Sequence, residues 1–100
     1  MLILHPLFYM NFEHEILLVL RETGVEGMPV RRIVLNVFNM RNSFFAPLSY
    51  DAVYDKVASW LRTVSQQSGS PVVRASRRGW YRLNPNSQQV QQLLLEFSNL

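Results

Sequence analysis

The sequence predicts an α+β domain that is mostly helical, with one β-hairpin placed before the last helix. Four stretches carry apolar residues at the three- and four-residue spacing of an amphipathic helix. One stretch near Gly79 has two short runs of β-forming residues on either side of a turn. The chain has 100 residues, of which 48% are hydrophobic, and this is enough for a single domain with a buried core.

The first expected helix begins at Asn11, whose side chain can cap it, and ends near Thr23. Gly24 and Gly27 follow, and glycine readily adopts the backbone angles that a helix exit requires. The inward side of this helix is expected to hold Phe12, Ile16, Leu17, Leu18, Val19 and Leu20.

Residues 1–10 (MLILHPLFYM) form an apolar arm ahead of the domain, which we place at residues 11–100. No lysine or arginine precedes the apolar run and Pro6 interrupts it, which is untypical of a secretory signal. The run is also too short to span a bilayer. We expect it to pack as a strand or arm on the domain or on a second copy, unless Met10 is the true start.

The stretch MPVRRIVLNVFNM predicts a second helix with Pro29 at its first position, where the missing N–H costs nothing. Residues 27–30 (GMPV), at the start of this stretch, also have the features of a short third strand. Arg31 and Arg32 fall on the outward side near the start of the helix. The inward stripe, at helical spacing, is Val30, Ile33, Val34, Val37 and Phe38.

Ser49 can cap a third helix that runs from Tyr50 to about Gln66, with Asp51 favourable in its first turn. The expected outward side includes Asp51, Asp55, Ser59 and Arg62. The expected inward side is Tyr50, Val53, Tyr54, Val57, Trp60, Leu61 and Val64.

The runs VVRAS and WYRLN are expected to pair around a three-residue loop that ends at Gly79, because the last loop position suits a left-handed residue. In this register Arg74 lies opposite Arg82, and Val73 lies opposite Leu83. The core side of the hairpin would then be Val73, Ala75, Tyr81 and Leu83. The outer side would be Arg74, Ser76, Trp80 and Arg82.

A fourth helix is expected after a break at residues 84–87 and runs to Leu100, with Val90, Leu93, Leu94 and Phe97 inward. The order helix, helix, helix, hairpin, helix over residues 11–100 resembles a winged helix-turn-helix domain. The resemblance also rests on the hairpin VVRASRRGWYRL, whose second strand is similar to many wings in its aromatic–Tyr–x–Leu pattern. It implies a DNA-reading third helix and a hairpin that serves as the wing.

The basic residues concentrate in the hairpin. Residues 71–84 contain four arginines and no acid, in a chain whose net charge is +3. Two arginines opposite each other would repel by up to about 1 kcal/mol unless an anion lies over them, and Trp80 is close enough for Arg74 or Arg82 to stack on. This pattern favours phosphate binding by Arg74, Arg77, Arg78, Trp80 and Arg82. The alternative is a solvated hairpin whose arginines discourage edge pairing.

The third helix is a less favourable surface for DNA. If the resemblance carries its usual function, Ser59 and Arg62 would face the bases there. However, Asp51 and Asp55 lie one turn apart and would repel backbone phosphates. We interpret Asp51 as support for the helix N-terminus and Asp55 as a solvated charge. Arg31 and Arg32, and Arg41 after the second helix, are candidates for additional phosphate contacts. The alternative for each of them is an ordinary surface position.

Catalytic and metal-binding patterns are missing from the sequence. The chain has no cysteine, and its two histidines, His5 and His14, are isolated. Asp51 and Asp55 have no third ligand at motif spacing, and no glycine-rich phosphate loop occurs. We therefore expect neither an enzyme nor a bound cofactor or metal.

These observations predict a nucleic-acid-binding protein that contacts double-stranded DNA through a basic wing, as a small transcriptional regulator. The alternative is a protein-interaction or dimerisation module with the same scaffold and no DNA binding, supported by the acidic third helix, Phe44, Phe45 and the apolar arm. A homodimer through the arm or the terminal helices would suit either function. We expect a cytoplasmic protein, located at the nucleoid or in the nucleus when bound to DNA.

Overall fold

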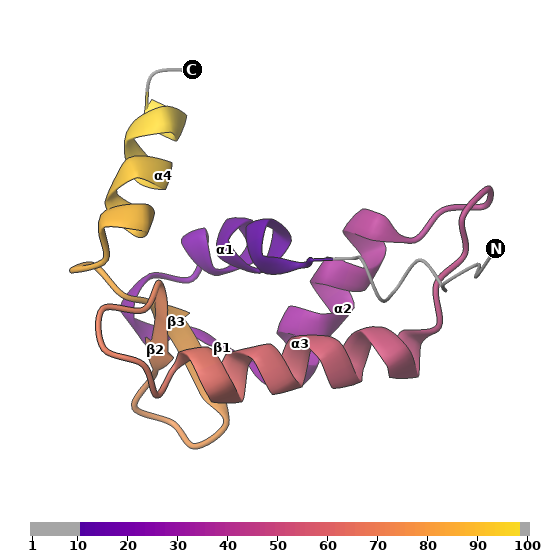
Figure 1. Cartoon of the computed structure of the whole chain (residues 1–100), viewed down its shortest axis with the longest axis horizontal. Coiled ribbons are helices and arrows are strands. Elements are labelled where there is room, and N and C mark those ends of the chain that lie inside the picture. Colours follow the sequence, from indigo (N-terminus) through magenta and orange to yellow (C-terminus); the bar gives the residue numbers. More distant parts are fainter. Residues whose placement is uncertain (1–10, 99–100) are drawn as a thin grey trace, which may run out of the picture.

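The computed structural model describes residues 11–98 as an α+β unit with four α-helices and a small antiparallel sheet (Figure 1). The expected arm at 1–10 lies outside the described residues, as do residues 99–100. None of the helices in the described part is long and apolar enough to cross a membrane. The elements are α1 (Glu13–Arg21), the 3₁₀ turn η2 (Gly24–Glu26), β1 (Met28–Pro29), α2 (Val30–Arg41), α3 (Tyr50–Val64), β2 (Val72–Arg74), β3 (Trp80–Leu83) and α4 (Gln88–Ser98).

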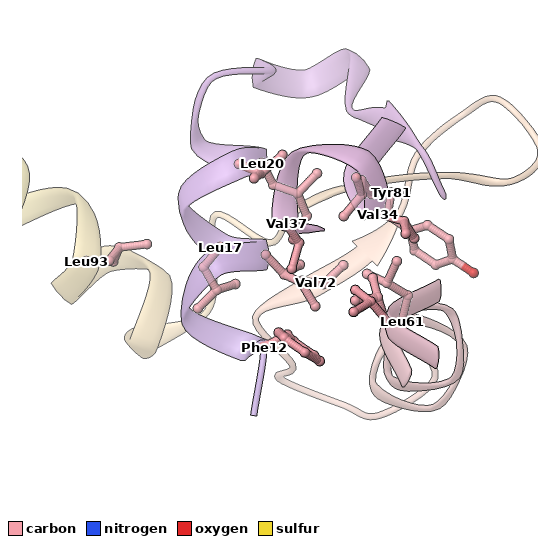
Figure 2. Close-up of a cluster of buried hydrophobic side chains, with 14 residues drawn as sticks. Phe12, Leu17, Leu20, Val34, Val37, Leu61, Val72, Tyr81 and Leu93 are labelled. Carbon is pink, nitrogen blue, oxygen red and sulfur yellow. The ribbon is translucent and has the colours of Figure 1, made fainter. Parts of the chain in front are cut away.

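The core is formed by α1, α2 and α3 together with one face of the sheet. Figure 2 shows side chains of these elements converging on one another, with Leu93 of α4 at the margin. The stripes expected for the first two helices are confirmed, since their central members are buried. The largest side chains with less than 2% exposure are Ile16, Leu20, Ile33, Val34, Val37, Val53, Val57, Leu61, Val72 and Val90.

Short polar side chains accept hydrogen bonds at the starts of two helices, α1 and α3. Asn11 Oδ1 accepts a hydrogen bond of 2.8 Å from the Glu13 N–H, at the start of α1. Ser49 Oγ accepts one of 3.3 Å from the Ala52 N–H, in the first turn of α3. Each bond satisfies an amide that has no partner inside its helix. The predicted cap at Ser49 is confirmed, whereas the N-cap position of α1 is Phe12, one residue after the predicted Asn11.

The start of α2 differs from the prediction. Pro29 is not the first helical residue: it has an extended backbone (φ −70°, ψ 152°) and precedes the helix. It belongs to β1, an edge strand in which Met28 pairs with Tyr81 and Pro29 pairs with Trp80. A proline is tolerated in such a strand because an edge position need not donate an N–H. The short strand expected from GMPV is therefore confirmed.

Gly27 makes β1 possible. Its backbone angles are φ 77° and ψ −156°, a region that essentially only glycine occupies. A Cβ at this position would lie 2.2 Å from the carbonyl oxygen of Tyr81 and 3.2 Å from the Cβ of Ala75. The chain thus crosses close over the hairpin here, and only a residue without a side chain leaves the necessary space.

The hairpin is present, but its predicted register is wrong by one residue. In the sheet order β1-β3-β2, the pairs are Val72–Leu83, Val73–Arg82 and Arg74–Tyr81. Hydrogen bonds at its base hold this alignment: the Asn84 N–H donates to the Pro71 carbonyl at 2.9 Å, and the Asn84 amide group donates to the Ser70 carbonyl at 2.8 Å. The loop therefore has four residues, 76–79, rather than three.

The changed register places each side chain of β2 on the opposite face of the sheet from the one predicted. Val72 has 0% exposure and belongs to the core, whereas Val73 lies on the opposite face with Arg82. The prediction for β3 is unaffected, because Tyr81 is buried and Leu83 packs against the core. A shift of one residue reverses every side chain of the shifted strand, which is why only one of the two strands was assigned to the wrong face.

Three other expected core positions are partly exposed: Leu94 on α4, and Tyr50 and Tyr54 on α3, of which Tyr54 is 37% exposed. Figure 1 shows α4 projecting from the rest of the fold, so among its described side chains (88–96) only Val90 and Leu93 are buried, and Leu94 is 44% exposed. On α3, Tyr50 is 38% exposed and contacts the ring of Phe38 edge-on at 5.4 Å between centroids. The expected inward position of Phe97 falls on a side chain outside the described set.

Candidate nucleic-acid interface

Backbone hydrogen bonds close the hairpin loop. The Trp80 N–H donates to the Arg77 carbonyl at 3.0 Å, and the Ala75 N–H donates to the Trp80 carbonyl at 2.9 Å. Gly79 has φ 80°, so the left-handed position expected at the end of the loop is confirmed. The loop that carries Arg77 and Arg78 is thus an ordered turn, and both side chains lie on its exposed surface.

The four hairpin arginines have no acidic partner within residues 11–98. The ion pairs of the described chain are Arg21–Glu22 and Arg41–Glu15, neither of which involves the hairpin. Arg74, Arg77 and Arg78 are exposed and Arg82 is half-buried. Their charges are therefore not neutralised inside the described part of the molecule.

The arrangement of these arginines differs from the expected one. Arg74 lies opposite Tyr81, and Arg82 lies opposite Val73, so the expected cross-strand repulsion between Arg74 and Arg82 is wrong. Because their positions belong to different faces of the sheet, no anion is needed between them. The positive charge that could attract an anion therefore lies in the loop, at Arg77 and Arg78, and at the start of α2 beside it.

Trp80 does carry a stacked guanidinium, but from a different arginine. The guanidinium carbon of Arg77 lies 4.7 Å from the centroid of the Trp80 ring, within the range of a cation–π contact. The expected partners were Arg74 and Arg82. The four-residue loop places Arg77 at its second position, from where the side chain reaches back over the ring.

The start of α2 lies directly beside the hairpin loop. The Val30 N–H donates to the Gly79 carbonyl at 3.1 Å, and Pro29 pairs with Trp80. Arg31 and Arg32, both exposed, occupy the first turn of α2, which has no acidic residue. Cations are unfavourable at this end of a helix dipole, and an anion there would be favourable. We call this end of the molecule the basic end; its residues, of which those in the hairpin lie on both faces of the sheet, are Arg31, Arg32, Arg74, Arg77, Arg78, Trp80 and Arg82.

The candidate residues Ser59 and Arg62 belong to α3 and not to the hairpin. Ser59 and Arg62 are exposed, on the outward side that also carries Asp51 and Asp55. No hydrogen bond or ion pair joins Ser59 or Arg62 to the hairpin in the described structure. A shallow hollow of about 470 Å³ follows this side of the helix; it is lined by Asp55, Lys56, Ser59, Trp60, Thr63 and Val64.

A contact that the sequence did not predict joins α1 to α2. Arg41 was expected to be an ordinary surface residue, but its guanidinium bonds to Glu15 and lies 5.5 Å from the centroid of the Phe12 ring.

His14 lies in a cleft of about 620 Å³ between α1 and α4, where Glu13 accepts a hydrogen bond from Gln89. No group of three metal-ligating side chains occurs among residues 11–98.

The basic end is thus the largest concentration of unpaired positive charge in the described part of the chain. It combines an ordered loop, a helix N-terminus and arginines that project into solvent, which is the chemistry that contacts to phosphate groups require. Comparisons of the chain with protein-family models, with curated proteins and with solved structures found no match.

Proposed function

We propose that the chain is a nucleic-acid-binding domain of the winged helix-turn-helix type, which holds double-stranded DNA mainly through its basic hairpin. The observation that carries the proposal is the set of four hairpin arginines without an acidic partner in residues 11–98. The element order supports the fold assignment, because a short strand before α2 joins the hairpin in one sheet and three helices cover it.

The surroundings of the loop add to this support. Arg31 and Arg32 oppose the dipole of α2, and their position beside Gly79 adds to the charge of the loop. Phosphate groups of a nucleic acid would neutralise both groups of arginines at once. Counterions released from the DNA would supply much of the binding free energy.

The wing is a better surface for DNA than α3. The outward side of α3 presents Asp51 and Asp55, both exposed, near the N-terminal end of that helix. These carboxylates would face the phosphates of a duplex laid along α3, and the repulsion would weaken binding. Base contacts by Ser59 and Arg62 are therefore a secondary part of the proposal.

A titration of a fluorescent DNA duplex at several salt concentrations tests the proposal. If about four phosphates are neutralised, the logarithm of affinity falls with the logarithm of salt with a slope of about −3 to −4. Replacing Arg77 and Arg78 together by alanine is expected to reduce the steepness of that slope by about 2. The control is Lys56→Ala, which removes an exposed positive charge outside the proposed contacts and should leave the slope unchanged. Absent or salt-insensitive binding by the wild type would contradict the proposal.

A protein-interaction module is the second candidate, favoured by Phe44 and Phe45. They are 91% and 94% exposed in the α2–α3 connection, and their rings contact each other edge-on at 5.4 Å. The connection is held by a hydrogen bond of 2.7 Å from the Leu48 N–H to Asn42 Oδ1. An adjacent pair of exposed phenylalanines on an ordered loop suits a protein partner or a second copy.

Light scattering on the wild type and on Phe44→Ser/Phe45→Ser distinguishes the two candidates. A homo-oligomer that the double variant dissociates, together with absent duplex binding, would favour the interaction module. Under the DNA proposal the double variant binds the duplex as tightly as the wild type, because both phenylalanines lie outside the basic end.

A further inference from the structure

We propose that Trp80 is a positioning residue that holds Arg77 toward a phosphate group, and that it is not a stacking platform for nucleic-acid bases. The inference rests on the proposed function and deepens it, because it identifies the sugar–phosphate backbone of a duplex as what the hairpin grips. A partly exposed tryptophan between arginines would otherwise suit a single strand, in which unpaired bases stack on aromatic rings.

The geometry of the loop leaves one face of the Trp80 ring occupied. The Arg77 guanidinium lies over that face at 4.7 Å from the centroid, and the Trp80 N–H donates to the Arg77 carbonyl. The two residues are therefore joined through both backbone and side chain. Trp80 is half-buried, whereas Arg77 is exposed. A base that approached this face would have to displace Arg77 before it could stack.

A stacked guanidinium can still bind an anion. Its N–H groups lie in its own plane and point outward from its edges, so stacking on a ring leaves them available to phosphate oxygens. Holding the side chain in place before binding reduces the conformational entropy that is lost on complex formation. The stack thus raises affinity without adding any charge.

Arg78 supplies an internal comparison. It is the next residue in the loop and is also exposed, and no ring contact involves it among residues 11–98. Both arginines contribute one positive charge at the tip of the hairpin. Only Arg77 should therefore depend on the identity of residue 80.

Substitutions at residue 80 test the inference by duplex titration. Trp80→Leu fills part of the space without an aromatic face, and we expect it to weaken binding about two- to tenfold with an unchanged salt slope. Trp80→Phe keeps an aromatic face and should remain within about twofold of the wild type. Trp80→Leu should cause no further loss in an Arg77→Ala background, but its full loss in an Arg78→Ala background.

Two measurements on the free protein complete the test. Circular dichroism checks that each variant is folded, and NMR of the Arg77 side chain should show a ring-current shift that Trp80→Leu removes and Trp80→Phe retains. A missing shift in the wild type would overturn the inference. So would additive losses from Trp80→Leu and Arg77→Ala, or tighter binding to single-stranded oligothymidine than to duplex. Failure of the wild type to bind any duplex would instead overturn the proposed function, and the inference with it.

Discussion

The guanidinium of Arg41, at the end of α2, bonds to the carboxylate of Glu15 on α1, 26 residues away in the sequence. The Glu15 side chain is only 12% exposed, and its Oε2 atom accepts no hydrogen bond from the described residues. Arg41 is therefore the cation that allows this carboxylate to lie at the α1–α2 contact.

Arg41→Ala is expected to lower the free energy of unfolding by about 1–3 kcal/mol, because it leaves a largely buried carboxylate without its counter-charge. Urea denaturation measures the change. Glu22→Ala is the control, since it breaks the exposed Arg21–Glu22 pair, in which Glu22 is 70% exposed, and should change stability by less than about 1 kcal/mol. Equal losses of unfolding free energy from the two substitutions would show that the burial of Glu15 does not make its ion pair more important for stability.

Gly27→Ala is expected to destabilise the fold by about 3 kcal/mol or more, because the new methyl group would overlap the Tyr81 carbonyl as well as force an unfavourable backbone. Gly24→Ala is the matched control: Gly24 also has a positive φ of 64°, but nothing lies within 4 Å of its added Cβ. That variant should lose only about 1–2 kcal/mol. Thermal unfolding of both variants separates backbone strain from overlap, and similar losses would argue against the close approach of β1 to the hairpin.

Val72→Ala is expected to cost about 2–3 kcal/mol, because Val72 is fully buried and its truncation leaves a cavity. Val73→Ala should cost less than about 1 kcal/mol, since Val73 lies on the partly exposed face. The pair tests the strand register directly by chemical denaturation. The reverse order of the two losses would indicate the three-residue loop and the register predicted from the sequence.

Arg31→Ala with Arg32→Ala is expected to weaken duplex binding about tenfold at moderate salt, because two cations beside the loop are removed. The same double substitution should leave folding intact or slightly improved, since it removes charges that oppose the dipole of α2. Fluorescence anisotropy with a labelled duplex and a thermal melt check both outcomes. Unchanged affinity would limit the interface to the hairpin itself.

Local patterns predicted the helices well because a helix buries residues that are close in sequence. The stripe that includes Ile33, Val34 and Val37 follows from spacing alone, and all three are fully buried. The cap at Ser49 follows from a bond to an amide three residues away. The order of the elements could be predicted for the same reason.

The register of the hairpin could not be predicted in this way. Val72 and Val73 are both apolar, so either can face the core, and both loop lengths end at Gly79 in a left-handed position. Bonds from Asn84 to the base of the hairpin decide between them, and they join residues far apart in sequence. The Arg77–Trp80 stack was missed because it depends on that loop length.

The hydrogen bond from the Val30 amide to Gly79 has a consequence for solution measurements. First-turn amides of a helix lack an acceptor inside the helix and ordinarily exchange their protons with water rapidly. The Val30 proton can exchange only when the loop lifts away from α2, so its exchange rate reports how often that separation occurs. A molecule that binds the loop and holds it against α2 would slow the exchange of the Val30 amide proton without contacting Val30.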